Sequence, residues 1–136
     1  MNSRLTLYEL NLRIRDSLQE AFPGPVWVVA EISEMKVNRS GHCYLELIEK
    51  EESTDEIRAR AKAIIWSYSF RMLKPWFETT TGQPFTEGIR ILAEANVEYH
   101  PAYGLSLSIR DMDPAYTMGD LALRRREVLR QLEEAG

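Results

Sequence analysis

The chain has 136 residues, of which 44% are hydrophobic, and carries a formal net charge of −4. This length suits one domain with its own core, and the composition is that of a globular protein. No run of about 18 apolar residues is present, which excludes a membrane-spanning helix. One cysteine cannot form an internal disulfide, and the N-terminus lacks the layout of a signal peptide, so we expect a reducing, cytoplasmic setting.

The first predicted element is a helix. Thr6 and Glu9 have the spacing of a capping box, in which each side chain bonds the backbone N–H of the other residue. Apolar residues then recur at helical spacing, and the "FPGP" stretch at 22–25 ends the helix. The apolar stripe consists of Leu7, Leu10, Ile14, Leu18 and Ala21.

Three strands with a period of two follow. The first strand turns Val26, Val28, Ala30 and Ile32 inward. The second strand turns Cys43, Leu45 and Leu47 inward. The third strand turns Ile57, Ala59, Ala61, Ala63 and Ile65 inward. The "VNRSG" turn at 37–41 joins the first two strands. Residues 49–56 hold five acids and one lysine, which predicts a solvent-exposed hairpin tip between the second and third strands.

The second half is predicted as a helix, two strands and a final helix. The helix covers 68–79, with a break at Pro75 and an end at Gly82. Its inward residues are Phe70, Leu73 and Phe77, and we expect Trp76 and Phe77 to seal the end of the barrel. The fourth strand turns Ile89, Ile91, Ala93, Ala95, Val97 and Tyr99 inward, and the fifth turns Leu105, Leu107 and Ile109 inward. The last helix begins at Thr117, with Leu121, Val128 and Leu132 as its stripe and Arg124, Arg125 and Arg126 in its middle.

This order predicts a mainly β fold with flanking helices. Five alternating strands, with a helix between the third and fourth, are typical of the five-stranded OB-fold barrel, whose small interior suits alanine-rich inward faces. A flat five-stranded α+β sheet remains the alternative, because alternation alone does not exclude it. We expect residues 1–116 to form the OB domain with its N-terminal helix, and 117–136 to form a connector helix.

The residue types that catalysis or metal binding would need are missing from the pattern. His42 and Cys43 are adjacent on a strand, so their side chains point to opposite faces, and the only other histidine is His100. A structural zinc site needs four ligands, so we predict no metal and no cofactor. Cys43 shares a face with leucines and is predicted to be a core residue rather than a nucleophile.

Nucleic-acid binding agrees better with the pattern, although the net negative charge counts against a duplex binder. OB folds bind single strands on their second and third strands and the adjoining loops. Cations and aromatic rings on those outward faces would contact phosphates and bases. The candidate residues are Lys36, Arg39, His42, Tyr44, Arg58, Arg60, Lys62, Trp66 and Tyr103. A solvated cationic strand with no ligand is the alternative reading of the same residues.

The sequence also resembles the exodeoxyribonuclease VII large subunit family. The resemblance rests on the order of four pieces along the chain: "ELN" in the first helix, "VWVVAEIS", "SGHCYLEL" and the closing "DMDPAYTMGDLALRRREVLRQLEEAG". It implies an N-terminal OB-fold domain that binds single-stranded DNA. It also implies a separate nuclease domain, which degrades DNA to acid-soluble oligonucleotides, and a coiled-coil region that engages small subunits.

On this resemblance the chain is a fragment that ends at Gly136, without catalytic residues of its own, from a larger hydrolase. The acidic insertion at 51–56 and the long segment at 66–84 depart from the family pattern. Two other functions stay open: a domain that holds the multisubunit nuclease together, or an RNA- or tRNA-binding OB module.

Overall fold

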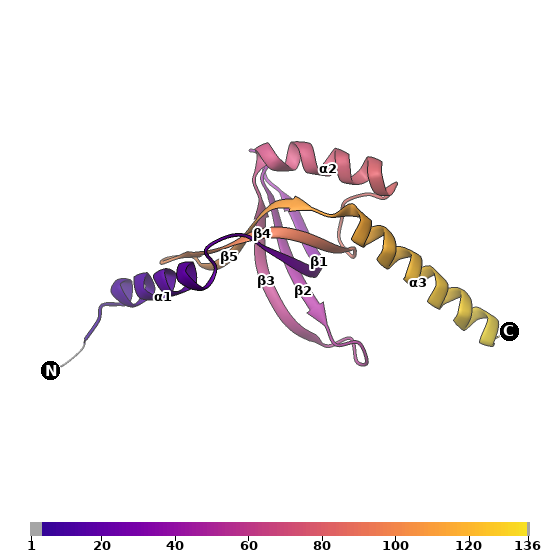
Figure 1. The fold of residues 1–136 in the computed structure, drawn as a ribbon, viewed down its shortest axis with the longest axis horizontal. Helices are drawn as coiled ribbons and strands as arrows, with labels where there is room; N and C mark the ends of the chain where they lie inside the picture. The colour runs from indigo at the N-terminus through magenta and orange to yellow at the C-terminus, as the bar shows by residue number, and fades with distance from the viewer. Residues whose placement is uncertain (1–3, 136) are drawn as a thin grey trace.

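In the computed structural model, which describes residues 4–135, five strands close into a barrel that carries three helices (Figure 1). The elements are α1 (Leu7–Ala21), β1 (Val26–Val37), β2 (Cys43–Lys50), β3 (Ile57–Ile65), α2 (Ser67–Thr81), β4 (Arg90–His100), β5 (Gly104–Met112) and α3 (Pro114–Ala135). The strand order around the barrel is β1-β2-β3-β5-β4, with β3 and β5 parallel. The predicted OB-fold order is confirmed, and closure of the barrel rules out the flat sheet.

The barrel interior is filled by the inward side chains of the strands. Buried residues alternate along most of each strand as predicted, and cross-strand partners such as Leu45 and Ala63 share the interior. Ile64 and Ser108, on the outward parity of β3 and β5, are buried as well, where these two strands pair.

Some predicted core residues are exceptions, among them Leu105 at the start of β5, which is 50% exposed. Ile57 and Ala59 are exposed, because the β2–β3 hairpin extends past the closed part of the barrel. Strand alternation sets the face of a side chain but not how far the neighbouring strands reach.

Helix α2 lies across one end of the barrel and buries Phe70, Leu73 and Phe77 there, as predicted. The chain then reverses at Gly82, whose φ is 68°, a left-handed conformation that favours glycine. Phe85 follows and packs edge-to-face against Phe77, with 5.3 Å between ring centroids.

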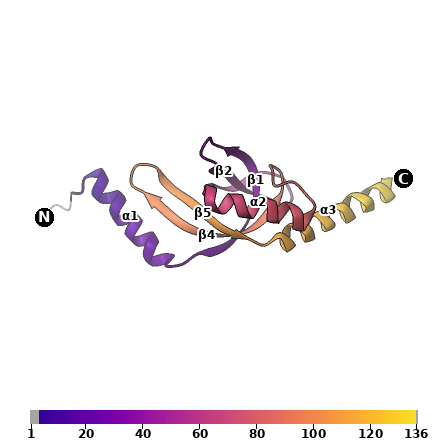
Figure 2. The same cartoon turned by 90° about the horizontal axis from the view of Figure 1, so that it is seen from above.

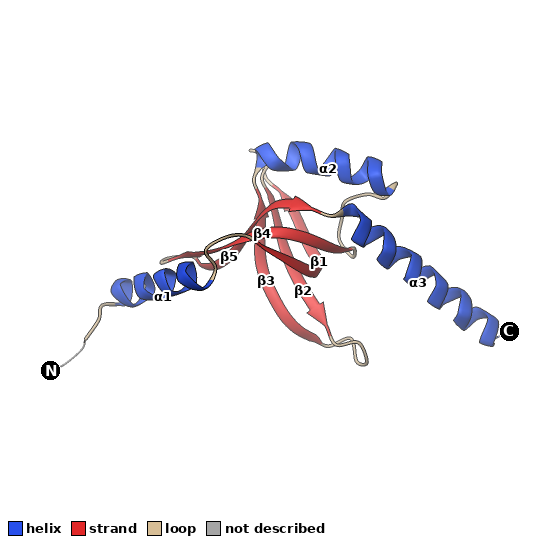
Figure 3. Ribbon diagram, in the orientation of Figure 1, coloured by secondary structure: helices blue, strands red, loops and turns tan. Residues whose placement is uncertain are grey.

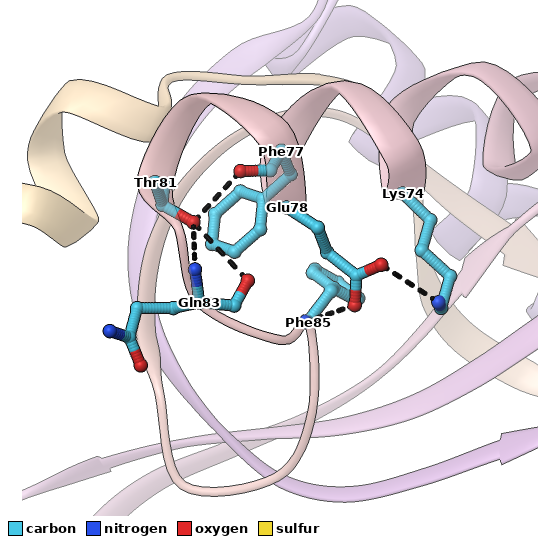
Figure 4. Close-up of polar contacts among 6 residues, drawn as sticks. All are labelled: Lys74, Phe77, Glu78, Thr81, Gln83 and Phe85. Atoms are coloured by element: carbon cyan, nitrogen blue, oxygen red, sulfur yellow. Dashed lines mark hydrogen bonds and ion pairs between the residues drawn. The ribbon is translucent and has the colours of Figure 1, made fainter.

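Polar contacts hold this returning loop (Figure 4). The Glu78 carboxylate accepts the backbone N–H of Phe85 at 2.8 Å and the Lys74 ammonium at 3.0 Å. The Thr81 hydroxyl donates to the Phe77 carbonyl at 2.8 Å and accepts the Gln83 N–H at 3.1 Å. The loop is therefore anchored to the last turn of the helix that it follows.

Two predictions for α2 were wrong. The helix is continuous through Pro75 instead of breaking there. Proline removes the N–H that would bond the Arg71 carbonyl, but both residues lie on the exposed face, where water can replace that donor. Trp76 does not seal the barrel end, since it is exposed while its neighbour Phe77 is fully buried.

The other two helices extend away from the barrel in opposite directions (Figures 1 and 2). The capping box of Thr6 and Glu9 is present in α1, but the helix has no buried residue. It lies against β4, where the Tyr99 hydroxyl donates to Asn11, so Tyr99 is half-buried at this contact and not part of the core.

Helix α3 begins at Pro114, three residues earlier than predicted. Thr117 is therefore inside the helix, fully buried, and its hydroxyl donates to the Arg90 carbonyl at 2.7 Å. Val128 and Leu132 of the predicted stripe are exposed, because α3 leaves the barrel (Figure 3). Gly136 lies outside the described residues. None of the helices within 4–135 has the length and apolar character needed to cross a bilayer.

Candidate nucleic-acid interface

The outer side of β1, β2 and β3, which we call the β1–β3 wall, gathers several of the predicted residues. Tyr44 lies opposite Lys36 on β1 and opposite Ile64 on β3. In the next rows Lys62 lies opposite Glu46, and Arg60 lies opposite Ile48. Residues directly opposite each other on neighbouring strands share a face. The register therefore brings Lys36, Tyr44, Arg60 and Lys62 onto one side of the barrel.

A shallow groove of about 570 Å³ runs over the middle of this wall. Its polar lining consists of Lys36, Lys62, Tyr44, Glu34, Glu46 and Glu87. Glu87 comes from the loop before β4, and its carboxylate accepts the Met35 N–H at 3.1 Å. The acidic members were not among the predicted site residues. Alternation from Val26 to Ile32 would turn Glu34 inward, but the register shift between Ile32 and Glu34 turns it outward. The approach of Glu87 likewise requires the folded loop.

The predicted cations differ in whether they already have a partner. Arg60 pairs with Glu46 at 3.0 Å, and Arg58 pairs with Glu49 at 3.5 Å and with Glu51 at 3.4 Å. Lys36, Arg39 and Lys62 form no ion pair with any residue in 4–135. The cations without a partner thus lie nearer the β1–β2 turn, and the paired ones lie toward the acidic tip of the β2–β3 hairpin.

His42 and Trp66, both predicted to meet bases, have partners within the fold. The His42 ring accepts the Ser67 N–H at 3.0 Å through Nδ1, and it packs edge-to-face on Trp66 with 4.9 Å between centroids. The Trp66 indole N–H donates to the Ser108 hydroxyl at 3.2 Å. Both side chains are half-buried where β2, β3, β5 and α2 meet. Tyr44, by contrast, is 45% exposed on the wall.

Tyr103 is not brought together with the other predicted residues. It lies in the β4–β5 turn, which runs beside α1 and away from the β2–β3 hairpin (Figures 1 and 2). Its side chain is 84% exposed and stacks on His100, with centroids 4.5 Å apart. A separate open cleft of about 700 Å³ lies at this end, lined by residues of α1 and of the turn.

Cys43 is placed as predicted, inside the barrel, with no exposed surface. Burial raises the pKa of its thiol to about 11. The thiol therefore stays protonated at neutral pH, whereas a nucleophile or a metal ligand must be a thiolate. Within 4–135, no three histidine, cysteine or acidic side chains gather in a way that would hold a metal ion.

Comparisons with known proteins agree with the OB fold of this chain. The sequence model of a family described as "OB-fold nucleic acid binding domain" matches residues 5–113. The chain is 33% identical over 137 aligned residues to the exodeoxyribonuclease 7 large subunit of Deinococcus radiodurans. The alignment covers 97% of this chain and 32% of that protein. It is 30% identical over 133 residues to the same-named protein of Rhodopirellula baltica, covering 97% of this chain and 26% of that one. The chain thus spans about a third or less of the length of these relatives.

Among solved structures, the N-terminal domain of the PriB protein of Thermoanaerobacter tencongensis superposes with a TM-score of 0.42 at 14% identity. The superposition covers 67% of this chain and 94% of that domain.

Proposed function

Because the chain belongs to the OB-fold nucleic acid binding domain family, we propose that it binds single-stranded DNA along the β1–β3 wall. The observation that carries the proposal is the register of the wall. It places the exposed Tyr44 ring beside Lys36, with Lys62 in the next row of the same groove. Neither lysine has a carboxylate partner within 4–135, so both ammonium groups are available to phosphates.

The proposed binding mode needs no cofactor. Lys36, Lys62 and Arg39 would contact successive phosphates, and a base would stack on Tyr44, where one such contact stabilises a complex by about 1–3 kcal/mol. Arg58 and Arg60 would join only after exchanging their glutamate partners for phosphates. Three glutamates in the groove weaken the attraction for a polyanion, so we expect modest affinity that depends strongly on salt.

The similarity to exodeoxyribonuclease 7 large subunits supports a role for this binding within a longer protein. We propose that the domain presents single-stranded DNA to an exonuclease domain, which degrades it to acid-soluble oligonucleotides in the cytoplasm. Small subunits of the nuclease would bind the remainder of that longer chain.

The proposal is tested by fluorescence anisotropy with labelled oligo-dT at two salt concentrations. The double variant Lys36→Gln/Lys62→Gln should lose affinity, and its plot of log affinity against log salt should be less steep by about 1.4, because two phosphate contacts are lost. Arg125→Gln/Arg126→Gln removes two exposed cations from α3 and is the matched control. Unchanged binding by the lysine variant would refute the assignment.

Competition with duplex DNA and with oligo-U measures which class of nucleic acid the domain prefers. Duplex DNA of the same length should compete poorly, since the groove is shallow and suited to an unpaired strand. Oligo-U that competes as well as oligo-dT would instead favour an RNA-binding module.

A further inference from the structure

One continuous segment of this acidic protein carries cations without any acidic residue among them. Residues 57–77 contain five cations and no acid, although the whole chain has a net charge of −4. These cations are Arg58, Arg60, Lys62, Arg71 and Lys74. The segment also holds two of the three tryptophans, Trp66 and Trp76. It comprises β3 and most of α2, so the charge does not stop at the edge of the β1–β3 wall.

The outward face of α2 carries large side chains that the fold does not use. Tyr68, Met72 and Trp76, which we call the α2 stripe, are 66%, 74% and 46% exposed. They repeat every four residues, which is about 6 Å along a helix, so the stripe extends over about 12 Å. The opposite face of the helix supplies the core contacts. Exposed apolar side chains gathered in this way mark an interaction surface.

Arg71 lies on the same outward face. It is exposed and forms no ion pair within the described part of the chain. Lys74, at the side of the helix, is paired with Glu78 at 3.0 Å. The outward face therefore combines two aromatic rings, a methionine and an available guanidinium.

The α2 stripe begins where the β1–β3 wall ends. The hydrogen bond from Ser67 to His42 joins the first turn of α2 to the residue before β2. In the β1–β2 turn, Gly41 lies so close to Ser67 that an added Cβ would come within 3.3 Å of the serine Cβ. Arg39 belongs to the same turn, two residues before Gly41. Figures 1 and 2 show α2 across the end of the barrel at which the β1–β2 turn lies.

We propose that the path of the single strand continues from Tyr44, past Arg39, onto the α2 stripe. Bases would stack on Tyr68 and Trp76, and Arg71 would contact a phosphate. This inference rests on the proposed function and assigns it a second binding surface. The charge favours a nucleic acid over a protein partner, because aromatic faces beside a cation without an ion pair, here Arg71, are what a sequence-tolerant single-strand surface needs.

The test compares oligo-dT of about 6 nucleotides, near the lower end of the usual site sizes of OB folds, with oligo-dT of about 20 nucleotides, which exceeds them. The chain with Tyr68→Ser/Trp76→Ser should bind the long strand at least about tenfold more weakly than wild type, as expected for the loss of base stacks. Its affinity for the short strand should be unchanged, because the short strand is held by the wall. Tyr68→Phe/Trp76→Phe keeps an aromatic ring at each position and should bind both strands like wild type.

A matched control removes an exposed aromatic ring elsewhere. Tyr8 on α1 is 63% exposed, and Tyr8→Ser should leave both affinities unchanged. Thermal unfolding of each variant, followed by circular dichroism, should show the wild-type melting temperature, which makes a folding defect visible.

Two results would overturn the inference and leave the proposed function standing. In one, the serine variant of the stripe binds the long strand like wild type. In the other, wild type binds both lengths equally well. The proposed function itself is tested separately by Lys36→Gln/Lys62→Gln, which should weaken binding of the short strand as well as the long one.

Discussion

The backbone N–H of Ser67 donates a 3.0 Å hydrogen bond to Nδ1 of His42. The first N–H groups of a helix have no partner within the helix, and the N-cap residue of α2, Trp66, provides no side-chain cap. The imidazole therefore performs the capping from the β1–β2 turn, one residue before β2. For this it must carry its proton on Nε2, so that Nδ1 can accept.

Replacing His42 with phenylalanine separates this capping role from base stacking. His42→Phe keeps an aromatic ring but removes the acceptor, so it should lower the free energy of unfolding by about 1–2 kcal/mol. Urea denaturation monitored by tryptophan fluorescence measures the change. Tyr44→Phe, on the exposed wall, is the control and should leave stability unchanged. A His42→Phe variant as stable as wild type would show that the hydrogen bond does not hold α2.

The buried thiol of Cys43 should make stability depend on pH in the alkaline range. Burial raises the pKa of Cys43 from 9.0 to about 11 in the folded chain. Between these values the unfolded chain releases the proton and the folded chain keeps it. Stability from this group is therefore complete below about pH 9 and is lost as pH rises toward 11.

Urea denaturation at about pH 8 and about pH 10.5 measures this loss. Cys43→Ala has no titrating group at the position and should lose less stability between the two pH values than wild type. Tyrosines and lysines titrate in both proteins, so their contribution cancels in the comparison. Equal losses would contradict the raised pKa of the thiol.

Glu78 should also make stability depend on pH, but here the stabilisation is lost as pH falls. The Phe85 N–H and the Lys74 ammonium lower the pKa of its carboxyl below the ordinary value of 4.5 (Figure 4). A lowered pKa contributes stability above the ordinary value, and that contribution disappears as pH falls through the folded pKa. Glu78→Gln should therefore melt at a lower temperature than wild type at neutral pH, with a smaller difference in acid. A difference that is the same at both pH values would mean that shape, rather than charge, holds the loop.

Local patterns in the sequence were sufficient to predict the barrel and much of its core. The period of two from Val26 to Ile65 identified the inward faces, the capping box at Thr6 fixed the start of α1, and the glycine at 82 fixed the end of α2. Each of these signals acts over a few neighbouring residues. The period of two fails where the structure alters the strand, at the register shift before Glu34 and in the extended hairpin at Ile57.

The site was less predictable, because its chemistry depends on contacts between distant residues. Alternation placed Arg60 on the outer face, but only the register of β2 and β3 shows that Glu46 already holds it. The use of His42 as a helix cap requires the fold to bring residue 67 next to it. The exposure of Val128 and Leu132 follows from the direction in which α3 leaves the barrel, which no local pattern encodes.

The glutamates of the wall yield a last prediction. Glu34 and Glu46 lie opposite each other on β1 and β2, and Glu46 also holds Arg60 at 3.0 Å. Glu34→Gln removes only a repulsive charge from the groove and should raise the affinity for oligo-dT by about two- to fivefold at low salt. Glu46→Gln removes a charge and also releases Arg60. It should therefore raise affinity further and steepen the salt dependence by about 0.7, the increment for one more phosphate contact.

The contribution of Arg60 is isolated in a double-mutant cycle with Arg60→Gln. In that background Glu46→Gln has no cation to release, so its gain should shrink to that of Glu34→Gln. If Glu46→Gln instead keeps its full gain when Arg60 is absent, then the ion pair does not restrain the arginine. In that case Arg60 should be counted with Lys36 and Lys62 as a phosphate contact of the unmodified protein.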